Sequence, residues 1–107
     1  MGIKNFTTRE FNAASNELAK IAGKFTNDGL NSSMSFFKDY TTLTIFDKDC
    51  KVICMFTIHR ERFVFNNDCK GLVDIAEKAN VTLKGKYMEM ILEKYKKEER
   101  SEGYIIF

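Results

Sequence analysis

The first quarter of the chain carries apolar residues at intervals of three and four, the spacing of one helix face. This pattern predicts a helix from about Thr8 to Lys24 whose inward face consists of Phe11, Ala14, Leu18, Ile21, Ala22 and Phe25. Thr7 and Glu10 stand at the two positions of a capping box, in which each side chain accepts a hydrogen bond from the other residue's backbone N–H. Residues 27–29 are Asn, Asp and Gly, which favour a turn and therefore end the helix.

The middle of the chain consists of segments rich in β-branched and aromatic residues, which favour strands. Two strands are predicted, Thr41 to Asp47 and Lys51 to His59, and the polar residues 47–50 predict a hairpin turn between them. A second hairpin leading to a third strand is predicted at residues 63–65. Residues 34–40 fit either a short strand or an ordered loop, and the pattern does not decide between the two.

The predicted strand over residues 51–59 is largely apolar on both of its faces. Successive side chains of a strand point to opposite faces. One face therefore holds Val52, Cys54, Phe56 and Ile58, and the other holds Ile53, Met55, Thr57 and His59. This pattern predicts a central strand, with helices against one face and the C-terminal tail, a second subunit or a foreign protein against the other.

Helical spacing returns in the last third of the chain. Asn67 or Asp68 is the predicted cap of a short helix that carries Leu72, Val73, Ala76 and Ala79, and Asn80 ends it in a left-handed conformation. A last helix is predicted from about Leu83 to Arg100, with inward residues Leu83, Tyr87, Met90, Ile91 and Tyr95. Residues 104–107 are too apolar for a free tail and suggest a short terminal strand.

These elements together predict one α+β domain over residues 1–107. Its order is an N-terminal helix, a three-stranded antiparallel sheet, two C-terminal helices and a short terminal strand. The chain has 107 residues, of which 44% are hydrophobic, so it can bury a core of its own. Helices are expected to cover one face of the sheet.

The charge and the cysteine content indicate which kinds of partner and which cellular compartment to expect. Seventeen basic and fifteen acidic residues leave a net charge of +2, too small for the broad positive field that phosphate-backbone binding uses. Three cysteines are an odd number, which favours thiols in a reducing compartment, and we predict a cytoplasmic protein. Residues 1–6 lack the apolar run of a signal peptide, and no membrane partner is predicted.

Metal and catalytic chemistry find little support in the sequence. Cys50, Cys54, His59 and Cys69 are metal-ligand types, but Cys54 and His59 have opposite parity on a predicted strand and should point to opposite faces. No local motif supports a Cys–His nucleophile, and the glycines are not spaced as in a nucleotide-binding loop. We therefore predict no cofactor, no metal and no enzymatic activity.

Basic and aromatic residues occur together after the second predicted strand. Arg60 and Arg62 stand beside Phe63 and Phe65, a mixture that single-stranded nucleic-acid binders use for phosphate contact and base stacking. The net charge is small and no wider basic cluster accompanies them. A nucleic-acid-binding domain is therefore the alternative hypothesis, and the aromatic residues are otherwise structural.

The leading hypothesis is a small non-enzymatic protein-interaction module, because the chain holds more apolar surface than one layer of helices covers. The surplus lies at Ile53 and Met55, in residues 34–37 and in residues 104–107. An inhibitor or adaptor of a larger protein fits the size of the chain, and a homodimer fits the same surplus. The abundance of Phe, Ile, Asn and Lys suggests an AT-rich gene, in keeping with an accessory protein of a phage or mobile element. The predicted binding residues are Ile53, Met55, His59, Arg60, Arg62, Phe63 and Phe65.

Overall fold

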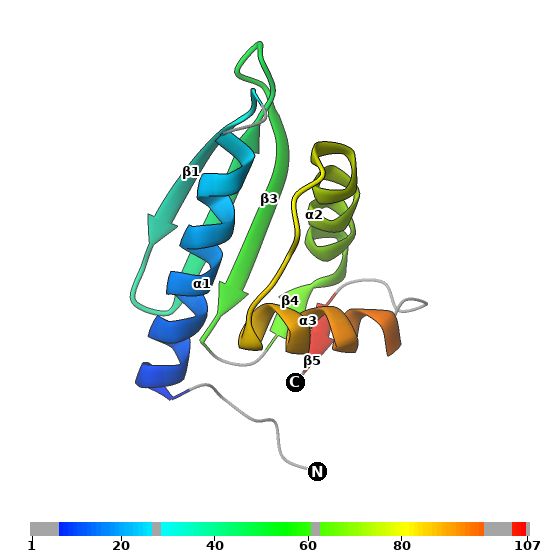
Figure 1. The fold of residues 1–107 in the computed structure, drawn as a ribbon. Coiled ribbons are helices and arrows are strands. Elements are labelled where there is room, and N and C mark those ends of the chain that lie inside the picture. The colour runs from blue at the N-terminus through cyan, green and yellow to red at the C-terminus, as the bar shows by residue number, and fades with distance from the viewer. Residues whose placement is uncertain (1–6, 27–28, 61–62, 98–103, 107) are drawn as a thin grey trace.

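The computed structural model describes residues 7–26, 29–60, 63–97 and 104–106. Figure 1 shows an α+β fold, as predicted, with an N-terminal helix, a three-stranded antiparallel sheet and two further helices. The elements in chain order are α1 (Thr8–Thr26), β1 (Asn31–Phe36), β2 (Tyr40–Phe46), β3 (Val52–His59), β4 (Phe63–Phe65), α2 (Asn66–Ala79), α3 (Lys86–Lys97) and β5 (Tyr104–Ile106).

The main sheet has the strand order β1-β2-β3, and both of its strand pairs are antiparallel. The central strand is thus β2, and the prediction that the strand over residues 51–59 is central was wrong. Residues 31–36 form the third strand, although their serines favour turns. Two contacts hold this segment: Met34 packs against the core, and the Ser32 hydroxyl donates to the Ala22 carbonyl of α1 at 3.0 Å.

A second, two-stranded sheet joins β4 to β5, with Val64 opposite Ile105. Strands at residues 63–65 and in the terminal segment were both predicted, but the predicted hairpin between β3 and residues 63–65 was wrong. The local pattern identifies an apolar strand without identifying its partner, and here the partner lies some forty residues away in the chain. α2 follows β4 directly, so Asn67 and Asp68, the predicted caps, lie one and two residues inside the helix.

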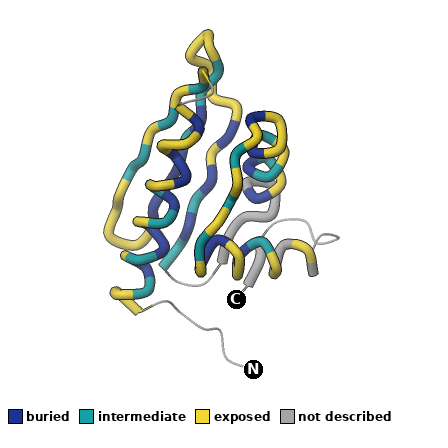
Figure 2. The backbone as a smooth tube through the Cα atoms, viewed as in Figure 1, coloured by how far each residue is buried: buried dark blue, intermediate teal, exposed yellow. Residues whose placement is uncertain are grey.

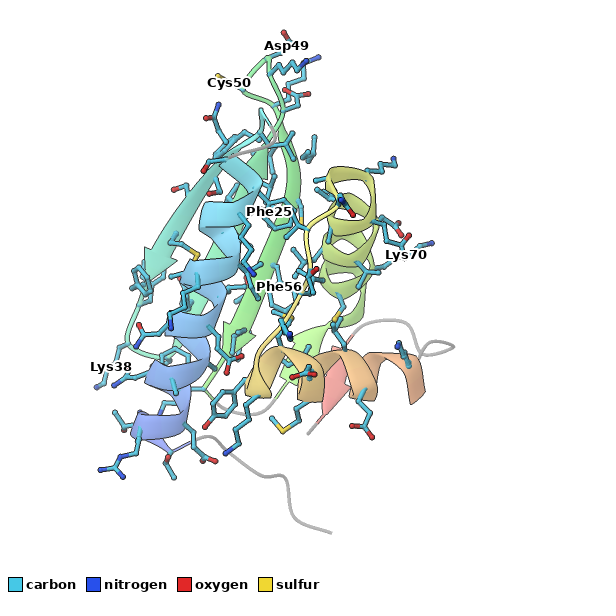
Figure 3. All side chains as sticks on the ribbon, in the orientation of Figure 1. Phe25, Lys38, Asp49, Cys50, Phe56 and Lys70 are labelled. Carbon is cyan, nitrogen blue, oxygen red and sulfur yellow. The ribbon has the colours of Figure 1, made fainter. Side chains whose placement is uncertain are left out.

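The core lies between the helices and one face of the main sheet, here called the inner face. Figure 2 shows the buried residues of α1, α2 and the sheet facing one another. All six residues predicted for the inward face of α1 are buried. Phe25 of α1 and Phe56 of β3 both belong to this core and are completely buried, whereas Lys38, Asp49, Cys50 and Lys70 point outward in Figure 3. One polar pair lies inside this layer: the hydroxyls of Ser15 and Thr41 are 2.7 Å apart.

Local capping signals in the sequence are confirmed at two helix ends. Thr7 N donates to Glu10 Oε1 at 2.9 Å, and Glu10 N donates to Thr7 Oγ1 at 3.1 Å, which completes the capping box of α1. Asn80 has a φ of 55°, and the amides of Asn80 and Val81 donate back to the carbonyls of Glu77 and Ala76. This pattern is a Schellman motif at the end of α2.

The last helix begins at Lys86, three residues later than predicted. Tyr87 and Ile91 are buried as predicted, but Met88 is buried beside them, while Met90, predicted to point inward, is exposed. Leu83 lies before the helix and is half-buried against the core. The side chain of Tyr95 lies outside the described residues.

The start of α3 depends on a carboxylate from α1. Gly85 is the N-cap of α3, since its carbonyl accepts the helix's first hydrogen bond from Glu89 N, but glycine has no side-chain oxygen to cap the helix. Glu17 supplies one: its Oε1 accepts from Tyr87 N at 3.0 Å and from Met88 N at 3.1 Å. A Cβ at Gly85 would overlap this carboxylate, and the φ of 141° also disfavours any other residue.

We expect Glu17→Ala to lower the free energy of unfolding by about 1–3 kcal/mol, the cost of a lost cap with two amides left unpaired. Gly85→Ala should cost roughly 2–4 kcal/mol, because it adds backbone strain to the displacement of Glu17. Chemical denaturation followed by circular dichroism measures both. Glu77→Ala, at an exposed position of α2, is the control. A loss for Glu17→Ala no larger than that of the control would contradict the role of Glu17.

The turn between β2 and β3 holds a non-glycine residue in a left-handed conformation. Asp47 N donates to the Lys51 carbonyl at 2.9 Å, and Asp47 Oδ1 accepts from the amides of Asp49 and Lys51. Cys50 takes the position that glycine usually fills in such three-residue loops, with a φ of 63°. The thiol is exposed at the hairpin tip.

Cys50→Gly should therefore raise the free energy of unfolding by about 0.5–1 kcal/mol, since relief of the left-handed strain exceeds the added freedom of the unfolded chain. The matched control is Asp49→Gly in the same turn, where φ is not positive, so only the entropic loss remains. Thermal melts of the two variants should shift in opposite directions. A fall in melting temperature for Cys50→Gly would refute this explanation.

Candidate protein-interaction surface

The face of the main sheet that points away from the helices is defined by the strand register. Ser32, Met34 and Thr41 contact α1 or the core, so they and the residues of the same parity belong to the inner face. The opposite face, called the outer face below, receives three residues from β1 and four each from β2 and β3. They are Asn31, Ser33, Ser35, Tyr40, Thr42, Thr44, Phe46, Val52, Met55, Thr57 and His59.

No aspartate, glutamate, lysine or arginine occurs among these eleven outer-face residues, although 30% of the chain is charged. The middle of the face consists of hydroxyls, and those of Thr42 and Thr57 lie 3.0 Å apart across the β2–β3 pair. Apolar side chains flank this hydroxyl band. Val52 and Met55 on β3 are each 53% exposed. Charged residues are depleted in the same way at the centres of protein–protein interfaces.

An aromatic cluster lies at the end of the outer face where β1 turns into β2. Tyr40 and His59 are direct cross-strand partners, with ring centroids 5.7 Å apart. Phe37 stacks on Tyr40 at 4.5 Å with an interplanar angle of 21°. The Phe37 amide donates to the Tyr40 carbonyl at 2.9 Å, so the turn itself holds the two rings together. Phe37 is half exposed, which leaves this stacked pair available for contact.

Of the two cations near the aromatic cluster, Arg60 lies beside a carboxylate. Arg60 Nη1 lies 3.8 Å from Asp39 Oδ1, and the Arg60 amide donates to the Asp39 carbonyl. Lys38 is exposed on the same turn. Because Arg60 is next to a carboxylate, its charge is partly neutralised before any phosphate approaches. This arrangement weakens the predicted use of Arg60 in nucleic-acid binding.

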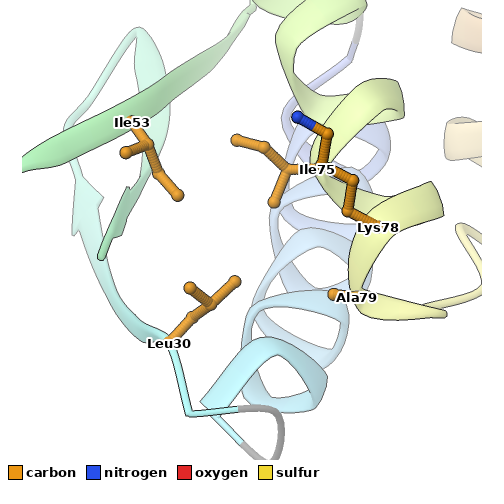
Figure 4. A pocket seen from close by; sticks show the side chains of 5 residues that line it. All are labelled: Leu30, Ile53, Ile75, Lys78 and Ala79. Atoms are coloured by element: carbon orange, nitrogen blue, oxygen red, sulfur yellow. The ribbon is translucent and has the colours of Figure 1, made fainter. Parts of the chain in front are cut away.

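Ile53 lies on the other side of the sheet from Met55, contrary to the predicted sharing of one face. The predicted face of Val52 was also wrong, since Val52 pairs with Phe46 on the outer face while Cys54 pairs with Ile45 on the inner face. The register shifts at the start of β3, where Cys54 pairs with Ile45 but Val52 pairs with Phe46, so that Ile53 is the extra residue of a β-bulge. Figure 4 shows Ile53 directed toward Leu30 and toward α2. Together they border an open groove of about 370 Å³ lined by Leu30, Ile53, Ile75, Lys78 and Ala79.

The predicted binding residues therefore divide into three groups. Met55 and His59 lie on the outer face, and Arg60 follows at its end. Ile53 lines the groove beside α2. Arg62 and the side chains of Phe63 and Phe65 lie outside the described residues. Sequence reasoning did not single out Tyr40, Thr42, Thr44, Phe46 and Val52, although the alternation in residues 40–46 marks four of them as sharing one face.

The described residues offer few groups for chemistry beyond binding. Within that part of the chain, no cluster of three or more His, Cys, Asp or Glu side chains could hold a metal ion. Cys54 and Cys69 are buried, while Cys50 lies at the hairpin tip, and no disulfide joins these three cysteines. None of the helices that the structure describes has the length and apolar character needed to cross a membrane.

Comparison with protein-family models, with curated proteins and with solved structures gave no match.

Proposed function

We propose that this protein is a small non-enzymatic interaction domain that binds a larger protein through the outer face of its sheet. The observation that carries the proposal is the absence of charged side chains from the eleven outer-face residues, together with the exposure of Val52 and Met55. Fully burying an apolar side chain of this size stabilises a complex by about 1.5–3 kcal/mol. Thr42 is buried and its hydroxyl pairs with Thr57, so the exposed Ser33 and the half-buried Thr44 would supply hydrogen-bond donors and acceptors for orientation.

An inhibitor or adaptor is the role that best suits this geometry. The chain offers one sheet face that no described helix covers, and the aromatic pair Phe37 and Tyr40 stands at its end as an aromatic anchor of the kind found at binding hot spots. The residue bias of the sequence fits an accessory protein of a phage or mobile element. Three cysteines without a disulfide among them suit the reducing cytoplasm.

Charged substitutions on the outer face provide the test. Thr44→Lys at its centre and Met55→Lys beside it should each reduce capture of the partner from a lysate at least tenfold, because a lysine there would be desolvated without a counter-charge. Thr44 and Met55 are cross-strand neighbours, so both variants probe one spot. Quantitative affinity capture with immobilised wild-type and variant proteins measures the effect.

Asn16→Lys on the exposed side of α1 is the matched control, since it adds the same charge away from the outer face. It should capture the partner as the wild type does. Circular dichroism melts confirm that each variant is folded. If a protein is captured equally by all four chains, the outer face is not its binding site and the proposal fails.

Nucleic-acid binding is the second candidate function, and the stacked pair Phe37–Tyr40 beside the exposed Lys38 favours it. Bases stack on such rings, and phosphates contact such cations. Fluorescence anisotropy with a labelled single-stranded oligonucleotide should then show affinity that falls steeply with salt and falls again in Tyr40→Ala. Absence of binding at low salt would remove this candidate and leave the protein partner.

A further inference from the structure

β1 forms an edge of the main sheet with one row of its backbone groups directed away from β2. The Phe37 amide donates to the Tyr40 carbonyl, so these two residues form a hydrogen-bonded pair. In an antiparallel ladder such pairs alternate, and every second residue of a strand points its N–H and C=O to the other side. Ser32, Met34 and Phe36 are those residues in β1. No other described strand pairs with this edge (Figure 1).

This edge lacks the features that usually prevent strand pairing between chains. Natural edge strands carry lysine, proline or a bulge, or are very short. β1 has six residues, Asn-Ser-Ser-Met-Ser-Phe, with no charge and no proline, and its register against β2 is unbroken. Phe36 at its end is 60% exposed. In a chain that is 30% charged, an edge of this composition is suited to receive another strand.

We propose that β1 pairs antiparallel with β1 of a second copy, so that two copies form one continuous six-stranded sheet. A second copy of β1 fits this edge because two antiparallel copies of one strand present the same backbone groups to each other. With Met34 opposite the second copy's Met34, Ser32 faces Phe36 and Phe36 faces Ser32, and every outward N–H meets an outward C=O. The edge is uncharged, so it does not repel its own copy. The two inner faces then lie on the same side, which makes the helical layers continuous as well.

A glycine on α1 provides an independent observation. Gly23 lies inside the helix and is exposed, and a Cβ built on it would meet no atom within 4 Å. Glycine inside a helix is unfavourable, and no side-chain contact among the described residues requires it here. Gly23 follows Ala22, whose carbonyl accepts from Ser32 of β1, so it lies near the proposed junction. A bare backbone at this point leaves room for the α1 helix of the second copy.

The junction is narrow, since a six-residue strand is only about 20 Å long. Interfaces at the low end of the size range are weak and reversible. We therefore expect a dimer whose population rises with concentration, and the measurements should extend to about 1 mM protein. The outer face stays open on both copies, so a dimer would present two binding faces side by side.

Light scattering and sedimentation equilibrium test the dimer. At high concentration the wild type should approach twice the 12.4 kDa mass of one chain. Ser33→Lys/Ser35→Lys places like charges opposite one another in the proposed register and should remain a monomer. Ser33→Glu/Ser35→Glu should do the same, and mixing the two variants should restore a dimer. A wild type that stays monomeric throughout, or a double-lysine variant that still dimerises, overturns the proposal.

Hydrogen–deuterium exchange gives a readout that needs no variant. The amides of Ser32, Met34 and Phe36 should exchange rapidly in dilute protein and become protected as concentration rises, by at least tenfold. Protection that is independent of concentration contradicts the pairing.

Thr44→Lys separates this proposal from the proposed function. Thr44 is the cross-strand neighbour of Ser33 on β2, one strand away from the edge. The variant should lose the partner protein and keep the dimer, whereas Ser33→Lys/Ser35→Lys should lose the dimer. If Thr44→Lys abolishes the dimer while the double-lysine variant does not, the copies pair through the outer face and the edge model is wrong.

Discussion

The Glu17 carboxylate at the start of α3 connects the first part of the fold to the last. Seventy residues separate it from the amide that it caps, and no nearer side chain replaces it, because the N-cap residue is Gly85. A negative charge at a helix N-terminus also interacts favourably with the helix dipole. Once α3 is held in this way, Met88 and Ile91 close the core at the end of α1.

With α3 held in place, the helices and the core lie on one side of the main sheet. α1 and α2 pack on the inner face and α3 completes that layer, so all the large buried side chains lie on one side of the main sheet. None of the described helices covers the outer face. The sheet therefore keeps a surface that has no charge to hydrate it strongly and no helix to bury it, and both proposals start from that imbalance.

Features encoded within a few residues were predictable from the sequence. The capping box at Thr7, the left-handed Asn80 and the buried face of α1 follow from local chemistry and periodicity, and the structure has all three. Which strands pair with each other was harder to predict from the sequence. The sequence shows that residues 63–65 are strand-like but not that they join β5. It left residues 34–40 undecided between strand and loop, because the packing of Met34 against the core is a tertiary contact.

The residues of the candidate interaction surface were also only partly predictable from the sequence. Parity alone placed Met55 and His59 together on the face opposite the helices, and the structure has both on the outer face. Ile53 was misplaced because parity assumes an unbroken strand, and one unpaired residue reverses it. Arg60 was selected for its charge, and the sequence could not show that this residue lies beside Asp39 of the β1–β2 turn.

The bulge at Ile53 has a consequence for how this fold can change during evolution. Val52 and Ile53 are consecutive in the chain but serve opposite surfaces, one the outer face and the other the groove beside α2. Loss of a single codon here would remove the bulge and reset the alternation for the start of β3. A homologue without the extra residue would therefore need a different apolar pattern to keep the same two surfaces, and aligning the two chains by hydrophobic alternation would set them one residue out of step.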